Sequence, residues 1–252
     1  MSGEKGSSML TLVEQEKEQQ LLLKLCEKTP FGCKIASIAA AYGFDRGFSC
    51  FWLDDRSDAV FCLTDDLMII SGTVLDGEET AEFLKAVGPK TIFCAVRNAE
   101  TLSLPVTDSG DVLKKQLEAG EKTTLDPYEV DIREIYELLE KTGMVEEFEP
   151  FYLDLSHKLR HQTALALTEH DQETLTGCAV VSAISQNAAI LSALAVLPEF
   201  RRQGIGSRLV RRTESFFPGK TLYVFREKEK NREFYRELGY GKTDTWVYSQ
   251  WK

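Results

Sequence analysis

The stretch ALAVLPEFRRQGIGS, residues Ala193–Ser207, predicts a strand, a turn and the start of a helix in direct succession. The apolar run Leu191–Leu197 is typical of a buried strand, and Pro198 ends it because proline has no N–H to donate to a sheet ladder. Beyond the turn, apolar residues recur with helical spacing. Gly204 and Gly206 let an anion approach the bare backbone where unpaired N–H groups and the positive helix end lie. The stretch therefore predicts a phosphate-binding turn.

Other phosphate motifs do not fit this stretch. A dinucleotide-binding fingerprint needs G-x-G-x-x-G, and a P-loop needs G-K-[ST], and neither spacing occurs here. The hexapeptide alone is also compatible with an ordinary glycine turn flanked by solvated arginines, namely Arg201, Arg202 and Arg208. The elements on either side of the turn favour the phosphate site over this alternative.

A second motif follows downstream in the order that a known family uses. TLYVFRE, residues 221–227, predicts a strand, and KEKNREFYRELGYGK, residues 228–242, predicts a helix that ends at Gly239. LPEFRRQGIGSRLV, followed by this strand and by FYRELGY, resembles the GCN5-related N-acetyltransferase (GNAT) superfamily. The resemblance covers roughly residues 128–252.

The resemblance implies that acetyl-CoA is the cosubstrate, bound between two splayed parallel strands, without a metal. It implies that backbone groups on the first splayed strand hold the pantetheine arm and that an N–H near Val196 polarises the thioester carbonyl. The amides of residues 202–207 would hold the pyrophosphate. The residues that the resemblance assigns to the cofactor are Leu194, Ala195, Val196, Arg202, Gln203, Gly204, Ile205, Gly206, Ser207 and Asn231.

Tyr235 matches the usual general acid of the family. A phenol with a pKa near 10 is matched to a departing thiol near 8.5. The alternative is an ordinary helix aromatic in the core, like Phe234. The family often has an asparagine seven residues before this tyrosine, where this chain has Lys228; either Lys228 reaches the phosphates or Asn231 takes part from a shifted turn.

The general base is not identified by the sequence. Glu169 and Ser192 lie on predicted strands, whereas Glu199 lies past a strand end and is typical of a solvated turn. His157 and His161 lie with Tyr152 and Asp154 in the segment that, by the resemblance, walls the acceptor site. Histidines near neutral pKa can accept a proton, but two polar residues four apart are also typical of a solvated helix face.

Composition limits the remaining classes. The chain has 252 residues and a net charge of −10, which argues against a surface for nucleic acid or an anionic membrane. No stretch reaches the roughly 20 apolar residues of a membrane helix, and the N-terminus lacks a signal peptide's apolar core, so we expect a cytoplasmic protein. Six cysteines without C-x-x-C and three histidines show no metal spacing and indicate reduced core thiols.

The two halves of the chain run through similar elements, which predicts an α+β fold with a mixed sheet: residues 123–252 with the GNAT fold, after a divergent GNAT-like domain at 1–122. An unrelated α+β domain in front is the alternative. Glu78 and Glu79 stand where a pyrophosphate would dock in the first half, so we expect no cofactor there. The first half is expected to form helices at 10–27, 34–42, 76–88 and 111–119 and strands at 49–55, 59–65, 67–74 and 90–97.

The function that follows from the resemblance is transfer of the acetyl group of acetyl-CoA directly to a primary amine of a small molecule or peptide. The alternatives are a regulatory module that binds acetyl-CoA without turnover, an acyltransferase for a longer acyl-CoA, and a structural protein with a vestigial fold. The acceptor is not identified, and the oligomeric state is open, a dimer included.

Overall fold

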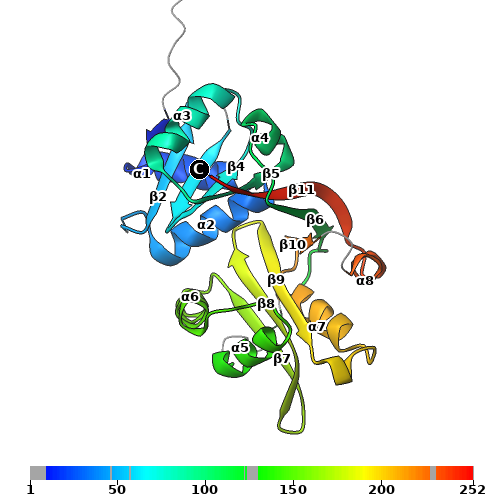
Figure 1. The fold of residues 1–252 in the computed structure, drawn as a ribbon. Helices are drawn as coiled ribbons and strands as arrows, with labels where there is room; N and C mark the ends of the chain where they lie inside the picture. The colour runs from blue at the N-terminus through cyan, green and yellow to red at the C-terminus, as the bar shows by residue number, and fades with distance from the viewer. Residues whose placement is uncertain are drawn as a thin grey trace, which may run out of the picture. The chain divides into compact units, whose positions relative to one another are not determined.

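A computed structural model describes residues 10–45, 47–56, 58–121, 123, 130–227 and 231–251 (Figure 1). The chain divides into two compact units, residues 1–111 with 244–252 and residues 112–243. Among the described residues, no helix is both long enough and apolar enough to cross a membrane.

The first unit has helices packed on a mostly antiparallel sheet. Its elements are β1 (Leu10–Leu12), α1 (Glu16–Cys26), α2 (Pro30–Tyr42), β2 (Ser49–Asp54), β3 (Val60–Thr64), β4 (Leu67–Ser71), α3 (Gly77–Val87), β5 (Thr91–Ala95), α4 (Val96–Thr101), the start of β6 (Asp108–Gln116) and most of β11 (Gly241–Gln250). The strands follow the order β1-β2-β3-β4-β5-β11, in which only β4 and β5 pair in parallel.

The second unit repeats this plan. Its elements are the rest of β6, α5 (Ile132–Lys141), α6 (Phe148–Arg160), β7 (Leu165–Asp171), β8 (Thr174–Ile184), β9 (Ala188–Val196), a 3₁₀ turn (Pro198–Phe200), α7 (Ile205–Glu214), β10 (Thr221–Glu227) and α8 (Arg232–Glu237). The strands follow the order β6-β10-β9-β8-β7; β7, β8 and β9 are antiparallel, and β9 and β10 are parallel.

Apart from β1 in the first and the 3₁₀ turn in the second, both repeats therefore consist of two helices, three antiparallel strands, a helix, a parallel strand, a short helix and a final strand. The final strands are exchanged between the units. β6 ends the first repeat, yet its residues 112–116 belong to the second unit, and residues 244–250 of β11 belong to the first. The predicted α+β class, with a repeated plan in the two halves, is confirmed.

Three predicted elements differ from the structure. Residues 10–12 form β1 rather than the start of a helix, because they pair with β2, and α1 begins only after Gln15, whose N–H donates to Glu18 at 3.0 Å. Residues 108–116 form β6 rather than a helix. The short helix of this repeat is α4, whose first residues had been expected to continue a strand. Strand pairing overrides local helix propensity here.

The sheet of the second unit is covered on both faces. On one face, α7 and α8 pack on side chains that include Leu191, Leu194 and Val196. On the other face, α5 and α6 pack on a core that includes Ala193 and Ala195. Alternation along β9 therefore directs the side chains of Leu194 and Val196 toward the α7 face.

Candidate functional site

β9 and β10 part from each other midway along their length. Among the described residues, their parallel register runs from Ala188–Thr221 to Leu191–Val224, although β9 continues to Val196. The register of β9 with β8 skips Ser192 at the same place. A bulge bends its strand, so the bulge at Ser192 accounts physically for the parting of the strands.

The main chain of β9 beyond this bulge offers hydrogen-bonding groups on its β10 side. Leu197 N–H donates to the Thr176 carbonyl on β8 at 2.9 Å. Because peptide groups alternate along a strand, those of Ala195 point toward β8, and those of Leu194 and Val196 point away from it. The Val196 carbonyl accepts a hydrogen bond from Arg201 Nε at 3.0 Å, which fits this alternation.

The glycine turn connects the end of β9 to α7 through two left-handed residues. Arg202 has φ +64° and Gly204, the N-cap of α7, has φ +79°. The first intrahelical bond runs from Arg208 N–H to the Gly204 carbonyl at 3.0 Å. The amides of Ile205, Gly206 and Ser207 therefore lie in the first turn of α7, where N–H groups lack helical partners.

Side chains hold this turn in place. Arg208 Nη1 donates to the Gln203 carbonyl at 3.0 Å, and its Nε donates to Glu169 on β7 at 3.1 Å. Gln203 Nε2 donates to the Glu199 carbonyl at 3.4 Å. Arg202 is exposed. Side-chain hydrogen bonds thus hold the main chain of the turn, and the exposed Arg202 cation lies next to the first turn of α7, whose N–H groups lack helical partners.

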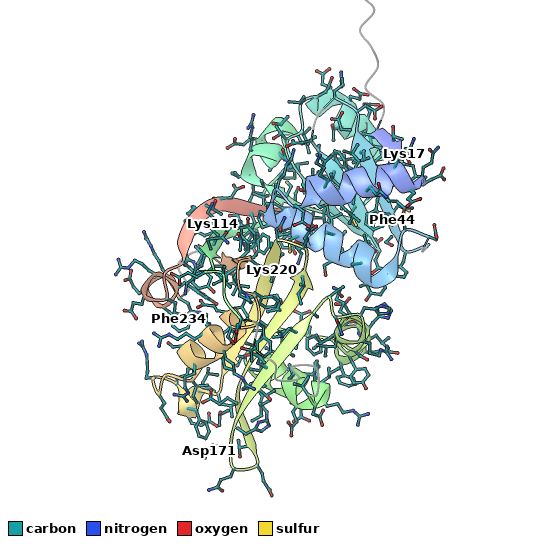
Figure 2. The ribbon with its side chains drawn as sticks, turned by 180° about the vertical axis from the view of Figure 1, so that it is seen from behind. Lys17, Phe44, Lys114, Asp171, Lys220 and Phe234 are labelled. Carbon is teal, nitrogen blue, oxygen red and sulfur yellow. The ribbon has the colours of Figure 1, made fainter. Side chains whose placement is uncertain are left out.

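Gly206 brings three elements of the second unit together. A Cβ built on Gly206 would lie 3.5 Å from the Phe234 ring of α8 and 3.8 Å from Val196 at the end of β9. Figure 2 shows Phe234 on α8. The predicted phosphate turn, the predicted pantetheine strand and the helix that bears Tyr235 therefore meet at this glycine.

Tyr235 is buried, with 6% of its surface exposed. Its ring centroid lies 5.1 Å from that of Phe234 and 5.7 Å from that of Tyr240. Burial raises the pKa of Tyr235 to about 12, and the charge of Arg226 opposes this rise. The phenol is protonated at neutral pH, but the raised pKa makes it a weaker donor to a thiolate than an ordinary phenol. Its packing is also that of a core aromatic, and its catalytic role stays a prediction.

Arg226 was missed in the sequence analysis. It lies on β10 with 6% of its surface exposed, next along the same face as Leu222 and Val224. Its charge acts on Tyr235. The signal was present in TLYVFRE, because strand alternation places this arginine on the face of two core residues.

The remaining candidates occupy varied surroundings. Asn231 has φ +56° and caps α8, where its carbonyl accepts from Tyr235 N–H at 3.2 Å. Lys228 lies outside the described residues. Ser192 Oγ donates to the Val180 carbonyl at 3.0 Å. The ring centroids of His157 and His161 lie 4.2 Å apart at the end of α6, with the ring planes tilted by 36°.

The corresponding place in the first unit is filled by the protein itself. The Asp76 carboxylate accepts from Glu79 N–H at 3.0 Å and so caps α3. Asn98 Oδ1 accepts a hydrogen bond from Val74 N–H at 3.1 Å, and Asn98 Nδ2 donates to the Gly72 carbonyl at 2.9 Å. A Cβ on Gly77 would lie 2.3 Å from the Thr101 carbonyl of α4, so α4 packs directly against the start of α3.

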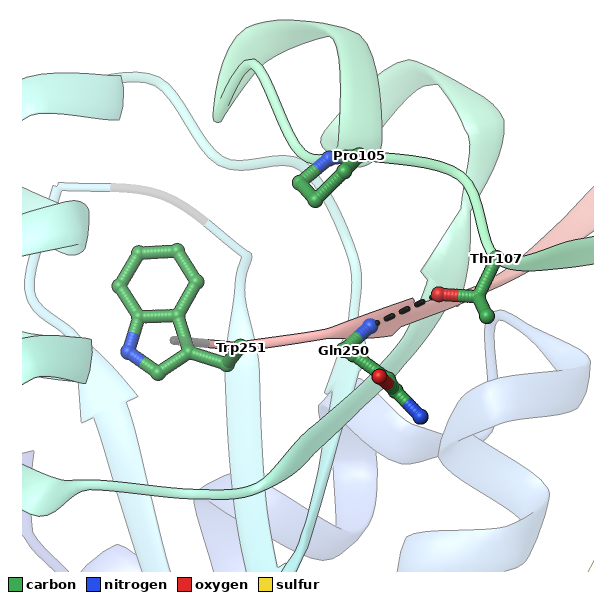
Figure 3. A pocket seen from close by; sticks show the side chains of 4 residues that line it. All are labelled: Pro105, Thr107, Gln250 and Trp251. Carbon is green, nitrogen blue, oxygen red and sulfur yellow. Dashed lines mark hydrogen bonds between the residues drawn. The ribbon is translucent and has the colours of Figure 1, made fainter.

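The first unit also contains a cavity of about 390 Å³ (Figure 3). Pro105, Thr107, Gln250 and Trp251 line it, and Gln250 N–H donates to Thr107 Oγ1 at 3.0 Å. None of these side chains is ionisable or belongs to the predicted site. Among the residues that the structure describes, no group of three histidine, cysteine or carboxylate side chains is placed to hold a metal.

Comparison with known proteins agrees with this geometry. Residues 132–240 match the model of the acetyltransferase (GNAT) family. No curated protein matches the sequence. A Drosophila protein has a TM-score of 0.62 at 14% identity, covering 97% of this chain and 99% of its own.

Two further similar structures are those of GNAT proteins. A tandem GNAT protein from the clavulanic acid biosynthesis pathway has a TM-score of 0.55 at 13% identity, covering 96% of this chain and 97% of its own. A GNAT-family acetyltransferase from Colwellia psychrerythraea has a TM-score of 0.56 at 10% identity, covering 97% of this chain and all of its own, 100%. The match to the acetyltransferase (GNAT) family therefore covers residues 132–240 of this chain, within a fold that nearly the whole chain shares with a tandem GNAT protein.

Proposed function

We propose that residues 123–252 bind acetyl-CoA and transfer its acetyl group directly to a primary amine of a small molecule or peptide. The observation that carries the proposal is the parting of β9 from β10 at Ser192, directly before the glycine turn. It leaves main-chain groups of Leu194 and Val196 facing away from β8 and leads to the amides at the start of α7.

The donor chemistry of these residues fits acetyl-CoA. Amides at the start of α7, with Arg202 beside them, suit a pyrophosphate. The outward-facing peptide groups of Leu194 and Val196 can hydrogen-bond the amides of a pantetheine arm in the way that they would pair with a neighbouring strand. The thioester supplies the acetyl group.

The chain's own residues would then act as follows. The Val196 N–H polarises the acetyl carbonyl as a single oxyanion donor. The amine nitrogen forms the new C–N bond as the C–S bond breaks, and the amine proton passes to a base or water. Tyr235 donates its phenolic proton to the departing sulfur, and the buried charge of Arg226 favours negative charge nearby.

The first repeat would bind no cofactor in this scheme. Asp76 already caps α3, and Arg56 pairs with Asp76 at 3.7 Å and with Glu79 at 2.7 Å. A phosphate at this helix start would meet two carboxylates and the closely packed α4.

Calorimetric titration of the purified chain with acetyl-CoA, CoA and dephospho-CoA tests the proposal. We expect one site per chain. Two sites would overturn the assignment of the first repeat, and no binding would overturn the proposed function. An acceptor screen that follows thiol release then tests turnover.

A second candidate is a module that binds acetyl-CoA without turnover. The packing of Tyr235 between Phe234 and Tyr240 favours it, because this contact alone is sufficient reason for an aromatic at that position. Binding without thiol release for any amine tested would support this candidate over the transferase.

A further inference from the structure

The end of α8 is closed by a helix-terminating motif that includes Tyr235. Gly239, with φ +87°, follows the helix, and its N–H donates to the Arg236 carbonyl at 3.0 Å. Tyr240 N–H reaches back to the Tyr235 carbonyl at 2.9 Å. These are the two hydrogen bonds of a Schellman motif, in which the side chains at the same two positions also pack together. The ring centroids of Tyr235 and Tyr240 lie 5.7 Å apart, so main chain and side chain both connect these tyrosines.

A charged pair holds Tyr240 in turn. Tyr240 Oη donates to Glu214 Oε1 at 3.0 Å. Lys115 Nζ donates to Oε1 of the same carboxylate at 2.9 Å and to its Oε2 at 2.8 Å. The ammonium group also lies 5.6 Å from the Tyr240 ring centroid, within the range of a cation–π interaction. We call Lys115, Glu214 and Tyr240 the Glu214 cluster.

Burial strengthens the hydrogen bonds of the Glu214 cluster. Tyr240 is 5% exposed, and the side chains of Glu214 and Lys115 are 14% and 28% exposed. A hydrogen bond to an ionised acceptor is roughly twice as strong as one between neutral groups, and the low local dielectric adds to this difference. Burial and the adjacent Glu214 carboxylate raise the pKa of Tyr240, so its hydroxyl is a donor at neutral pH.

The Glu214 cluster joins three elements of the second unit. Lys115 lies on β6, Glu214 is the last residue of α7, and Tyr240 follows α8. Phe234 of α8 packs near Gly206 in the first turn of α7, at the 3.5 Å given above for a built Cβ. The short helix α8 is therefore attached to both ends of α7, the helix that begins at the glycine turn.

We propose that Tyr240 is a positioning residue for acetyl transfer: its hydrogen bond to Glu214 fixes the end of α8 and thereby holds the Tyr235 phenol at the departing sulfur. The inference rests on the proposed function and deepens it. A displacement of about 1 Å can slow a reaction up to a hundredfold, so this attachment acts on kcat rather than on cofactor affinity. Because Lys115 lies on β6, the last strand of the first repeat, the first repeat supplies one member of the Glu214 cluster.

Tyr240→Phe in the full chain tests the proposal, because it removes the hydroxyl and keeps the ring. We expect kcat for thiol release from acetyl-CoA, with the amine that the acceptor screen selects, to fall about tenfold. KM for acetyl-CoA and its calorimetric affinity should stay within about twofold. The matched control is Tyr248→Phe in the first unit, which keeps the ring stacked on Phe93 and should keep kcat within about twofold. Unchanged kcat in Tyr240→Phe, or equal losses in both variants, overturns the proposal.

A double-mutant cycle determines whether Tyr240 acts through Tyr235. In the Tyr235→Phe background, adding Tyr240→Phe should lower kcat by less than about a further twofold, because the group that Tyr240 positions is already gone. A further loss of about tenfold would show that Tyr240 acts independently of Tyr235 and would overturn the proposal. Lys115→Arg, which keeps a cation beside Glu214, should lower kcat less than Lys115→Met, and equal losses would argue against the role of the charge.

Hydrogen exchange measures the attachment of α8 without any turnover, after thermal unfolding has checked that each variant is folded. In Tyr240→Phe we expect faster exchange at the amides of Gly239 and Tyr240, with unchanged exchange along β7.

The outcomes separate this proposal from the proposed function. Unchanged exchange in Tyr240→Phe overturns the attachment alone. Faster exchange, together with unchanged kcat in Tyr235→Phe, overturns the positioning role because its target is not the proton donor. Absence of acetyl-CoA binding in the unmodified chain overturns the proposed function and, with it, this proposal.

Discussion

Arg208 of α7 is bound to Glu169 of β7, with Nε 3.1 Å from Oε1, and Arg208 Nη1 also holds the Gln203 carbonyl of the glycine turn. Glu169 is therefore occupied as the acceptor that positions this arginine. Its place on a strand had made it a candidate base.

Glu169→Gln should change kcat by no more than about threefold and should raise KM for acetyl-CoA by a few fold, because a looser Arg208 leaves the turn less ordered. The exposure of Arg208, 58%, limits the loss of stability to about 1 kcal/mol or less. Steady-state kinetics measure both constants. A loss of kcat of about a hundredfold or more would show that Glu169 is the base after all.

Gly206 and Gly204 should respond differently to alanine. A Cβ on Gly206 makes only ordinary contact with Phe234 at 3.5 Å, so Gly206→Ala should fold with an unchanged or higher thermal midpoint. It should also keep its acetyl-CoA affinity within about threefold, because the added Cβ faces Phe234 and Val196 at 3.5 Å and 3.8 Å. Calorimetric titration measures the affinity, and a loss of about tenfold or more would show that the Cβ crowds the phosphate.

Gly204→Ala should destabilise the fold itself. Gly204 has φ +79°, and a left-handed conformation costs a residue with a Cβ about 1–2 kcal/mol. Denaturant unfolding measures this loss beside Gly206→Ala as the matched glycine variant. Equal stability of the two variants would contradict the assigned strain.

Tyr235→Phe separates catalysis from packing. The phenyl ring preserves the contacts with Phe234 and Tyr240, so acetyl-CoA affinity should stay within about twofold, while kcat should fall about a hundredfold if the phenol protonates the leaving sulfur. Pre-steady-state and steady-state thiol release measure the effect. Unchanged kcat would leave Tyr235 with a packing role alone.

Stability should fall at alkaline pH. Burial raises the pKa of Tyr235, Cys94 and Cys178 to about 12, whereas unfolded phenols and thiols ionise near pH 10 and 8.5. Above about pH 9 the unfolded state therefore binds fewer protons than the folded state, and the free energy of unfolding decreases as pH rises. Urea unfolding between pH 7 and 10 measures this slope, which Cys178→Ala should make shallower. A flat profile would contradict the burial of these groups.

Lys115, from the last strand of the first repeat, supports α7 of the second. Its Nζ lies 2.8 Å from Glu214, which is only 14% exposed and also accepts from Tyr240 Oη at 3.0 Å. Lys115→Met should cost roughly 1–3 kcal/mol, because the carboxylate keeps its burial and loses its cation. Adding Glu214→Gln should recover part of the loss in a double-mutant cycle. Additive losses in unfolding experiments would show that the pair is not coupled.

Local pattern predicted most of the second repeat. The apolar run before Pro198, the two glycines of the turn and the spacing of FYRELGY led directly to β9, α7 and α8. Each of these signals acts within a few residues, through proline's missing N–H, glycine's freedom at positive φ and helical periodicity. The same kind of pattern failed for β1 and β6, which form strands because of partners distant in the chain.

The sequence by itself determined the glycine turn and the order of elements in the second repeat, because these follow from local conformational preferences. Only the tertiary structure decided that β9 bulges at Ser192, that β6 and β11 are exchanged between the units, and that the charge of Arg226 acts on Tyr235. Strand register and exchange depend on hydrogen bonds between segments far apart in sequence, and no local pattern carries that information.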